Sequence, residues 1–224
     1  MPAQPLQEGY VPAAGRRALT GAYDRAVALT MREGTFRTRL RAQVLADAEG
    51  ELLEVVDLGC GTGALAIALA DERVRVTGVD GDPDILRQAQ RKRGAEHVSW
   101  HRGGADALPH PEASVDRVVC SLVLHHLRPA ARALALGEAR RVLRPGGRLH
   151  VADWGRPGGP VMALAFLGLR MLDGFANTAD FARGELPSLI AAAGFTDVSV
   201  RDRLRTGFGA LELISATRPV TDSG

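Results

Sequence analysis

The sequence is poor in lysine and cysteine, and both shortages exclude particular classes of protein. Lys92 is the only lysine among 28 basic residues, and Cys60 and Cys120 are the only cysteines. Two cysteines cannot form a secreted disulfide framework or a four-cysteine zinc site. The net charge is only +2, whereas nucleic-acid binders usually carry a concentrated basic excess. We therefore expect no metal site and no nucleic-acid partner.

Long hydrophobic runs are also missing. The longest apolar run, Val161–Leu169, is far shorter than the roughly 20 residues that a helix needs to cross a bilayer. Met1–Gly9 contains no basic region followed by an apolar stretch, so no signal peptide is expected. Hydrophobic residues make up 46% of the chain, as in ordinary globular proteins. These features favour a cytoplasmic protein without stable membrane insertion, and they leave a homodimer open.

Arginine takes the place of almost every lysine. The simplest interpretation is a GC-rich genome, in which arginine codons are frequent. The alternative is recognition of anions by guanidinium groups, which bind carboxylates and phosphates in a bidentate manner. Four arginines could meet an acidic substrate, although a solvated surface is the simpler expectation for each: Arg32, Arg37, Arg41 and Arg170.

Short β-branched, apolar runs alternate with helical segments in the middle of the chain. Strands are expected at residues 52–58, 74–79, 97–101, 115–121 and 148–152, and helices at 62–71, 82–93 and 129–143. This alternation indicates right-handed βαβ crossovers and a mostly parallel sheet. Two further strands, at 197–203 and 210–217, have no helix between them and should pair antiparallel. The predicted fold is an α/β sheet of seven strands with a C-terminal antiparallel hairpin and helices on both faces.

The ends of the chain are predicted to be largely helical. Residues 16–32 and 35–49 have apolar residues at helical spacing, with a break and cap expected at Gly34-Thr35. Residues 157–181 are apolar and contain no strand pattern, and 186–193 is expected to form a helix. Because no low-complexity linker or internal repeat interrupts the chain, we expect one domain over residues 1–224.

A glycine-rich turn follows the first predicted strand. Gly59, Gly61 and Gly63 lie between that strand and a helix. Glycine allows positive φ angles and a close approach of ligand to backbone, and the helix N-terminus offers unpaired N–H groups. A P-loop is excluded because no Gly-Lys-Ser/Thr follows. The spacing from Gly59 to Asp80 fits a dinucleotide fingerprint, so NAD remains open at this point.

Three carboxylates close to this turn favour a different ligand. Asp57 precedes the first glycine and would repel a diphosphate but attract an ammonium group. It could alternatively cap the following helix. Asp80 ends the second strand, where it could bind both ribose hydroxyls, and Asp106 follows the third strand, where it could bind an exocyclic amine. An ammonium, a ribose and an adenine amine together describe S-adenosylmethionine (SAM), which contains no phosphate.

Five segments match the motifs of one family in order and spacing. They are Val55–Gly63, Val79–Leu86, Gly104–Pro109, Asp116–Leu127 and Arg141–Asp153. The chain resembles a class I SAM-dependent methyltransferase, of the small-molecule type related to the ubiquinone and menaquinone biosynthesis enzymes. The resemblance implies a Rossmann-like fold with a SAM-binding core at 52–153. It also implies an N-terminal helical cap at 1–50, a helical substrate lid at 154–185 and a C-terminal helix and strand pair at 186–217.

The resemblance also assigns residues to the two halves of the cofactor. For the methionine half it implies Gly59, Gly61 and Gly63 under the cofactor, the backbone of Ser121 near the ammonium, and Tyr23 reaching the carboxylate. For the adenosine half it implies Asp80 on the ribose, Ile85 as an apolar wall for adenine, Asp106 on the adenine amine and the Ala107 N–H on a ring nitrogen. The expected product of the reaction is S-adenosylhomocysteine.

The candidate catalytic residue is His126. It follows the fourth strand together with His125, at the end of the sheet where ligands bind in α/β proteins. An imidazole titrates near neutral pH, so His126 could act as a base, line the pocket or have a structural role. We expect it to line the methyl-transfer pocket.

The acceptor pocket should come from the N-terminal helices and residues 157–181, whose apolar and methionine side chains suit an aromatic or lipid-like molecule. Core packing, a dimer face or a membrane-surface helix could explain the same residues. The predicted function is methyl transfer from SAM to an O, N or C nucleophile of a small apolar or aromatic molecule. A SAM-binding module without turnover is one alternative. A nicotinamide oxidoreductase is disfavoured because no tyrosine lies four residues before Lys92.

Overall fold

The computed structural model describes residues 33–46, 48, 52–159, 162–164, 166–167, 174–175, 177–207 and 209–220. The expected helix at 16–32 lies outside these residues, and so do residues 160–161, 165, 168–173 and 176 of the expected lid at 154–185. The expected division into cap, core, lid and C-terminal part therefore stays a prediction.

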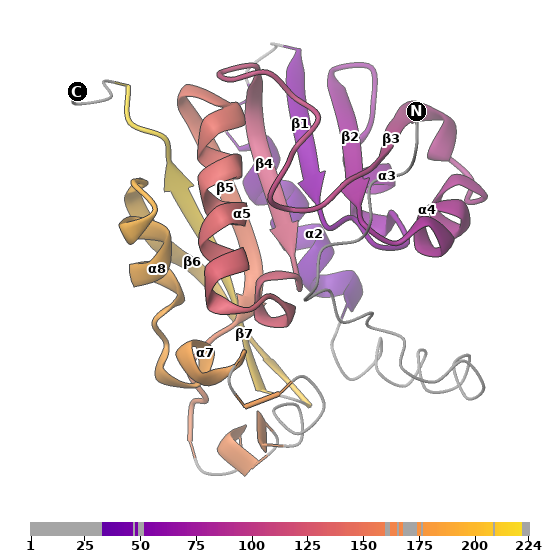
Figure 1. Ribbon diagram of the computed structural model, residues 1–224. Coiled ribbons are helices and arrows are strands. Elements are labelled where there is room, and N and C mark those ends of the chain that lie inside the picture. The colour runs from indigo at the N-terminus through magenta and orange to yellow at the C-terminus, as the bar shows by residue number, and fades with distance from the viewer. Residues whose placement is uncertain are drawn as a thin grey trace.

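The described residues form a sheet of seven strands, which confirms the predicted fold class (Figure 1). The strands are β1 (Leu53–Leu58), β2 (Val74–Asp80), β3 (Val98–Arg102), β4 (Val115–Ser121), β5 (Leu143–Trp154), β6 (Thr196–Thr206) and β7 (Gly209–Thr217). Their order across the sheet is β3-β2-β1-β4-β5-β7-β6. Strands β1 to β5 pair in parallel, and β7 runs antiparallel to both β5 and β6. The C-terminal antiparallel hairpin is thus confirmed.

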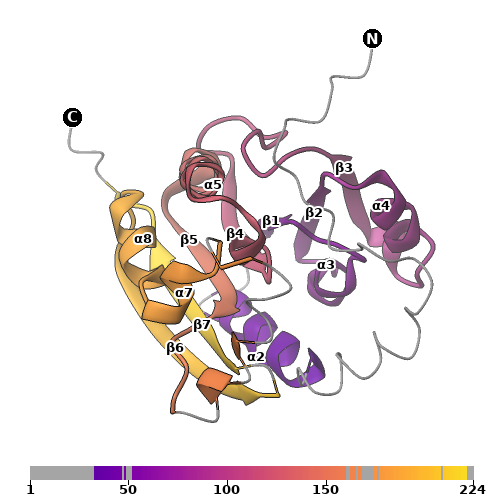
Figure 2. The same cartoon turned by 60° about the horizontal axis from the view of Figure 1, so that its bottom comes forward.

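Helices cover both faces of the sheet, as predicted. The α-helices are α2 (Glu33–Leu45), α3 (Ala64–Leu69), α4 (Pro83–Gln90), α5 (Pro129–Val142), α7 (Ala179–Arg183) and α8 (Leu186–Ala192), and the 3-10 helices are η1 (Ala95–His97) and η2 (Leu124–His126). Figure 2 shows α2 and α3 on one face and α5, α7 and α8 on the other.

The pattern of β1 explains why it lies at the centre of the sheet. Val56 and Leu58 belong to the core under α5 and α8, whereas Leu53 and Val55 belong to the core under α2 and α3. A strand that is buried on both faces needs a nearly continuous apolar sequence. The two polar exceptions are Glu54, which is half-buried, and Asp57, which is 1% exposed.

Helix α2 is built on three apolar residues at a spacing of four. Phe36, Leu40 and Val44 are at most 2% exposed and form one stripe against the sheet. The helix begins at Glu33, so the predicted break at Gly34-Thr35 is wrong. These two residues lie in the first turn, where Thr38 Oγ1 donates to the Gly34 carbonyl at 2.8 Å.

Local sequence signals predict the start of α4 correctly but not the start of β5. Asp82 caps α4 by accepting from the backbone N–H groups of Asp84 and Ile85, at 2.8 and 3.3 Å, and Pro83 follows at the first helical position. By contrast, β5 begins at Leu143 rather than at the predicted residue 148. The backbone of Gly146 and Gly147 pairs with Arg218, so tertiary pairing extends the strand through a sequence that normally breaks one.

No helix in the described part of the chain combines the length and the apolar character needed to cross a membrane.

Candidate functional site

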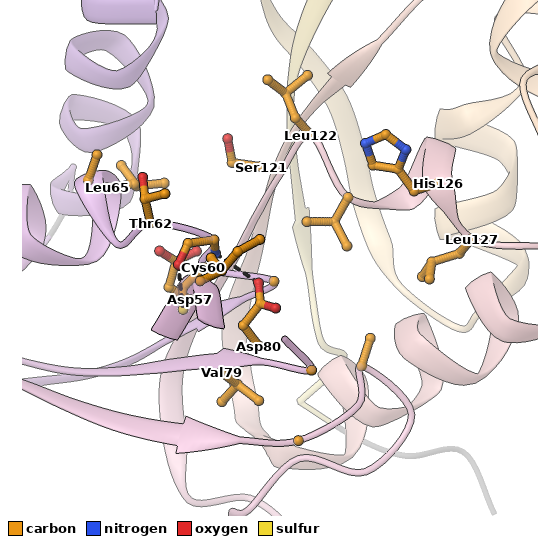
Figure 3. A pocket seen from close by; sticks show the side chains of 18 of the residues that line it. Asp57, Cys60, Thr62, Leu65, Val79, Asp80, Ser121, Leu122, His126 and Leu127 are labelled. Carbon is orange, nitrogen blue, oxygen red and sulfur yellow. Dashed lines mark hydrogen bonds between the residues drawn. The ribbon is translucent and has the colours of Figure 1, made fainter. Parts of the chain in front are cut away.

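A cavity of about 330 Å³ lies at the carboxyl ends of β1, β2 and β4. Ligands bind at this end of open α/β sheets, where the strand order reverses, and here the reversal falls between β1 and β4. The cavity is lined by Phe36, Arg37, Asp57, Gly59, Cys60, Gly61, Thr62, Ala64, Leu65, Val79, Asp80, Gly81, Ile85, Gly103, Gly104, Ala105, Ser121, Leu122, Val123, His126 and Leu127. In Figure 3, His126 and Leu127 lie across the cavity from Asp57 and Asp80.

The glycine turn adopts the backbone conformation that only glycine tolerates well. Gly59, Gly61 and Gly63 have φ angles of 70°, 53° and 74°. The N–H groups of Gly59 and Cys60 both donate to the Val79 carbonyl, at 2.8 and 3.0 Å, which fixes the turn to the end of β2.

The three glycines have different surroundings. A Cβ on Gly59 would lie 2.4 Å from Val123 Cγ2, and one on Gly63 would lie 2.3 Å from Trp100 Cη2. A Cβ on Gly61 would meet nothing within 4 Å, because Gly61 faces the open cavity. Gly63 does not line the cavity, so its described role is to let α3 pack against Trp100.

Asp80 is fixed in place by backbone groups. Its Oδ2 accepts from the Gly61 N–H at 2.9 Å (Figure 3), and its Oδ1 accepts from the Asp82 N–H, also at 2.9 Å. Each carboxylate oxygen has a second lone pair available. The carboxylate therefore has a fixed orientation at the cavity and can still accept hydrogen bonds from a vicinal diol.

Asp57 is a buried carboxylate at the cavity wall. Among the described residues, neither of its carboxylate oxygens has a hydrogen-bond partner. Burial raises the pKa of Asp57 to about 7, and the negative charge of Asp80 raises it further, against the opposing effects of the Ala66 backbone N–H and of Arg37. The Ala66 N–H lies in the first turn of α3, so its effect on the pKa of Asp57 agrees with the predicted alternative of a helix cap, although no side-chain hydrogen bond closes the cap. A buried carboxylate of this kind favours a cationic ligand group in the cavity.

Backbone strain marks the end of β4. Leu122, which follows Ser121, has a φ of 57°, which costs about 1–2 kcal/mol for a residue with a side chain. The Leu122 N–H donates to the Ala152 carbonyl of β5 at 2.8 Å, which holds the turn. Ser121, Leu122 and Val123 consequently all line the cavity.

Of the residues that were predicted to contact the adenine, only some line the cavity. Ile85 lines the cavity from the first turn of α4. Asp106 and Ala107 do not line it, and their place is taken by Gly103, Gly104 and Ala105. The Ala107 N–H already donates to the Gly104 carbonyl at 3.3 Å. Tyr23 lies outside the described residues, and so do Arg32 and Arg170.

His126 lines the cavity and is held in its neutral form. Burial lowers the pKa of His126 to about 4, and the neighbouring His125 lowers it further. The two imidazole rings lie 3.9 Å apart. A neutral imidazole at the cavity wall can accept a hydrogen bond from a hydroxyl group.

His125 faces the opposite way, into the core. Its Nδ1 lies 2.7 Å from Oδ1 of Asp153, whose exposure is 0%. Burial alone would raise the pKa of Asp153, but the adjacent His125 keeps it below the usual value. Since an ionised carboxylate only accepts, Nδ1 must carry the proton. His125 therefore fixes η2 to β5, and its neighbour His126 faces the cavity.

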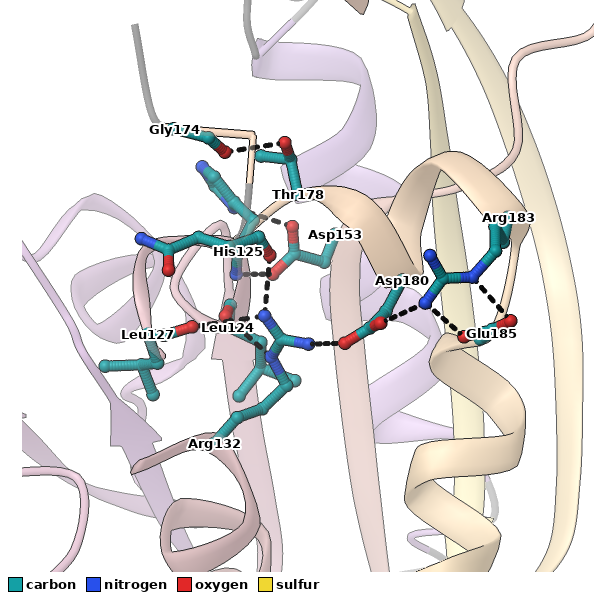
Figure 4. A network of polar contacts seen from close by, with 11 residues as sticks. Leu124, His125, Leu127, Arg132, Asp153, Gly174, Thr178, Asp180, Arg183 and Glu185 are labelled. Carbon is teal, nitrogen blue, oxygen red and sulfur yellow. Dashed lines mark hydrogen bonds and ion pairs between the residues drawn. The ribbon is translucent and has the colours of Figure 1, made fainter. Parts of the chain in front are cut away.

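Arg132 of α5 holds this same turn against the C-terminal helices (Figure 4). Its side chain, 2% exposed, donates to the carbonyls of Leu124 and Leu127 at 3.1 Å each, and to that of Asn177 at 2.7 Å. Nη1 pairs with Asp180 at 2.6 Å. One guanidinium thus links η2, which carries His126, to the described part of the expected lid.

Helix α2, which lies in the N-terminal region expected at the acceptor pocket, contributes Phe36 and Arg37 to the cavity wall. Sequence reasoning misses Phe36 as a lining residue and indicates Arg37 only as a group that could meet an acidic substrate. Arg41 does not reach the cavity, because its Nε donates to the Ala68 carbonyl at 2.6 Å. The apolar residue Phe36 could have been found from its place on the buried stripe of α2.

The cysteines and other acids have structural roles. Burial raises the pKa of the Cys60 and Cys120 thiols, which keeps both protonated. Asp116 accepts from the Glu54 N–H at 2.8 Å and pairs with Arg144 at 2.5 Å, as expected for a structural residue. No group of three potential metal ligands is found among the described side chains.

Comparison with known families identifies one match in the region of this cavity. The family described as "Methyltransferase domain" matches residues 55–147. This stretch begins in β1 and includes the glycine turn, Asp80 and the His125-His126 turn.

Similar proteins carry related names. A protein of Synechocystis, named as an uncharacterized methyltransferase, is 34% identical over 167 residues, which is 73% of this chain and 74% of the relative. A ubiquinone/menaquinone biosynthesis C-methyltransferase of Rubrivivax gelatinosus is 40% identical over 104 residues, or 46% of this chain and 40% of the relative. The chain thus spans less than half the length of that quinone enzyme.

A solved structure shows the same fold. Magnesium protoporphyrin IX methyltransferase from Synechocystis, with bound S-adenosylhomocysteine, superimposes with a TM-score of 0.65 at 19% identity. The match covers 91% of this chain and 89% of that one.

Proposed function

Because the chain belongs to the class I SAM-dependent methyltransferases, we propose that it transfers the methyl group of SAM to a hydroxylated aromatic molecule held between η2 and α2. When bound, SAM supplies an electrophilic methyl group on its sulfonium sulfur. The residues of the chain bind the cofactor, orient the acceptor and exclude water, which are the main contributions to such a reaction.

The main support for the proposed cofactor is the buried carboxylate of Asp57. Its oxygens accept no hydrogen bond from the described residues, and it lies at the wall of a cavity whose lining includes Arg37 and no lysine. The α-ammonium group of SAM would supply hydrogen-bond donors and a positive charge beside it. A diphosphate cofactor such as NAD would instead bring further negative charge towards Asp57 and Asp80, so the same observation disfavours it.

The other contacts to the cofactor are inferred from where the residues lie around the cavity. Asp80, oriented by two backbone N–H groups, would accept the ribose hydroxyls. Ile85 would lie against the adenine, and the open face of Gly61 would admit the methionine part. Gly59 and Gly63 would shape the turn, and the Ser121 backbone would lie near the ammonium. Asp106 and Ala107 would need a shift of their turn to reach the adenine.

The acceptor side of the cavity is apolar. Leu122, Val123 and Leu127 surround His126, and Phe36 lies on α2. Such a surface favours an aromatic ring, and a neutral His126 would accept a hydrogen bond from a ring hydroxyl and withdraw its proton as the methyl group is transferred. The name of the Rubrivivax relative agrees with an aromatic acceptor of this type. The segment 154–185, tied to η2 through Arg132, would form the lid over it.

The proposal is tested in two steps. Calorimetric titration should show binding of SAM and S-adenosylhomocysteine and no binding of NAD. Transfer of a labelled methyl group should then be measured with hydroxylated aromatic acceptors and with the same compounds lacking the hydroxyl groups.

His126→Gln should lower kcat with the hydroxylated acceptors at least tenfold and leave SAM affinity within about twofold, because general-base catalysis typically contributes such factors. The control is His97→Gln, which removes an exposed imidazole outside the cavity. Absence of binding by either adenosyl compound would refute the cofactor proposal. Binding without transfer to any acceptor would instead favour a SAM-binding module.

A further inference from the structure

A second cavity, of about 370 Å³, lies between α2 and the strands β5, β6 and β7. Arg39 and Gln43 of α2, with Ala46 just after its end, form one wall, and the strands supply the others through Arg148, His150, Arg201, Asp202, Leu213 and Ser215. It shares no lining residue with the cofactor cavity, although α2 borders both. The cofactor site therefore does not account for it.

Positive charge accumulates around this second cavity. Three guanidinium groups line it, from Arg39, Arg148 and Arg201. Among the described residues of its wall, one carboxylate is present, that of Asp202, which pairs with Arg39 at 2.6 Å. Among the described residues, no ion pair or hydrogen bond engages the exposed Arg201 side chain. Burial lowers the pKa of His150 to about 3, and Arg117, Arg148 and Arg201 lower it further.

His150 adds an unused donor at the same place. Gln43 Nε2 donates to the Ile214 carbonyl at 3.1 Å, so this atom is the amide nitrogen. The same nitrogen lies 3.0 Å from His150 Nδ1, which must then be the acceptor. The proton of the neutral imidazole is therefore on Nε2, and Nε2 has no described hydrogen-bond partner although His150 is 1% exposed. Buried donors are rarely left unpaired, and each costs about 1–3 kcal/mol.

We propose that this second cavity binds a phosphate group. Its donors come from three directions, α2, β5 and β6, which suits a tetrahedral oxyanion better than a flat carboxylate. Guanidinium groups also match phosphate geometry with paired N–H groups. The cavity exceeds the size of a phosphate ion, so free phosphate and the phosphate group of a small metabolite share the chemistry that it recognises.

The test is a calorimetric titration with inorganic phosphate and with glycerol 3-phosphate, at pH 8 and at constant ionic strength. Saturable binding of one equivalent is expected. The Arg201→Gln variant should weaken it about tenfold or more, the effect of losing a charge-assisted hydrogen bond. Arg205→Gln is the matched control: it removes the same charge from an exposed residue of the same strand outside the cavity.

A second readout follows His150 itself. A bound dianion offsets the nearby guanidinium charges, so phosphate should raise the pKa of His150, measured from its ring resonances in an NMR pH titration. Because Arg201 is exposed, its variant should fold, and its SAM binding should equal that of the unmodified protein. Failure of phosphate to bind would thus be distinct from failure of the cofactor proposal.

Each possible result of the titration either supports the phosphate site or overturns it. Tighter binding of glycerol 3-phosphate points to a phosphorylated metabolite, and equal or tighter binding of inorganic phosphate points to the free ion; both support the site. Three results would overturn it: no saturable binding at tens of millimolar, equal weakening by Arg201→Gln and Arg205→Gln, or equally strong binding of acetate.

Discussion

Gly61 donates its backbone N–H to Oδ2 of Asp80 at 2.9 Å, and this bond joins the glycine turn to the end of β2. The second oxygen of Asp80 accepts from the Asp82 N–H, so the cap of α4 is attached to the same carboxylate. Three segments that would hold the cofactor are therefore linked by one side chain before any ligand binds. This preorganisation reduces the entropy that binding must overcome.

Replacing Asp80 by asparagine should affect both stability and binding. The amide nitrogen cannot accept a hydrogen bond, so one of the two backbone N–H groups loses its partner. We expect a loss of about 1–3 kcal/mol in the free energy of unfolding and at least a tenfold loss of SAM affinity. Chemical denaturation and calorimetry measure the two effects. Asp71→Asn, in an exposed turn, is the control, and a loss of the same size in both variants would argue against the assigned role.

The glycine turn offers a matched pair of substitutions. Both Gly59→Ala and Gly61→Ala place a side chain at a positive φ, which costs about 1–2 kcal/mol. Only the Cβ at residue 59 would also collide with Val123. Gly59→Ala should therefore destabilise the protein by more than Gly61→Ala, whereas Gly61→Ala should weaken SAM binding by narrowing the cavity. Thermal denaturation that ranked the two variants in the opposite order would contradict this packing.

The strands and the glycine turn could be predicted because local sequence determines them. Val55 to Gly63 contains a buried apolar run and then glycines, and both are found where expected. Asp57 and Asp80 were expected at the cavity for the same reason, since strand ends meet at one edge of a parallel sheet.

Features that depend on distant contacts could not be predicted. The sequence places the N-terminal helices at the acceptor pocket, but the arginine of α2 that reaches the cavity, Arg37 and not Arg41, depends on how α2 packs across α3 and β5. The early start of β5 at Leu143 depends on pairing with Arg218, about 70 residues away, which outweighs the usual effect of Pro145-Gly146-Gly147. Asp106 and Ala107 match a motif, yet their turn bonds to itself and leaves Gly104 and Ala105 at the cavity.

Arg132 should be sensitive even to a substitution that keeps its charge. Lysine cannot reproduce four directed contacts to Leu124, Leu127, Asn177 and Asp180, nor the guanidinium stacking on Phe181 at 4.6 Å. Arg132→Lys should lower the free energy of unfolding by about 3–5 kcal/mol, the cost of disrupting a buried, paired charge. Arg128→Lys, on an exposed residue at the start of α5, should change it by less than about 0.5 kcal/mol. Equal effects of the two would show that the contacts of Arg132 are not needed.

The stability should depend on His126 at acid pH. Its pKa is about 4 in the folded protein, below the ordinary 6.5, so the unfolded chain binds more protons between these values. The contribution of neutral His126 is fully present above pH 6.5 and is lost as the pH falls towards 4. Denaturant titrations should therefore show the unmodified protein losing about 1–3 kcal/mol more than His126→Gln over this interval. Parallel pH profiles of the two proteins would show that His126 is not buried as described.

The pH dependence of stability that comes from Asp57 should be opposite to the one that comes from His126. Its pKa is raised to about 7, so the protonated carboxyl stabilises the folded state below pH 3.8, and this contribution is lost as the pH rises through 7. At pH 8, Asp57→Asn removes a buried charge and should raise the free energy of unfolding by about 2–4 kcal/mol. The same variant should bind SAM at least tenfold more weakly. Stability and function thus oppose each other at this residue.

The most direct test of a cofactor site built on Asp57 is calorimetric titration with SAM at pH 6.5 in buffers of different ionisation enthalpy. At this pH an α-amino group is cationic and Asp57 is mostly protonated in the free protein. If the SAM ammonium binds at Asp57, binding should release about half to one proton, and Asp57→Asn should release none. A heat of binding that is independent of the buffer, with equal SAM affinity in both proteins, would contradict the assignment.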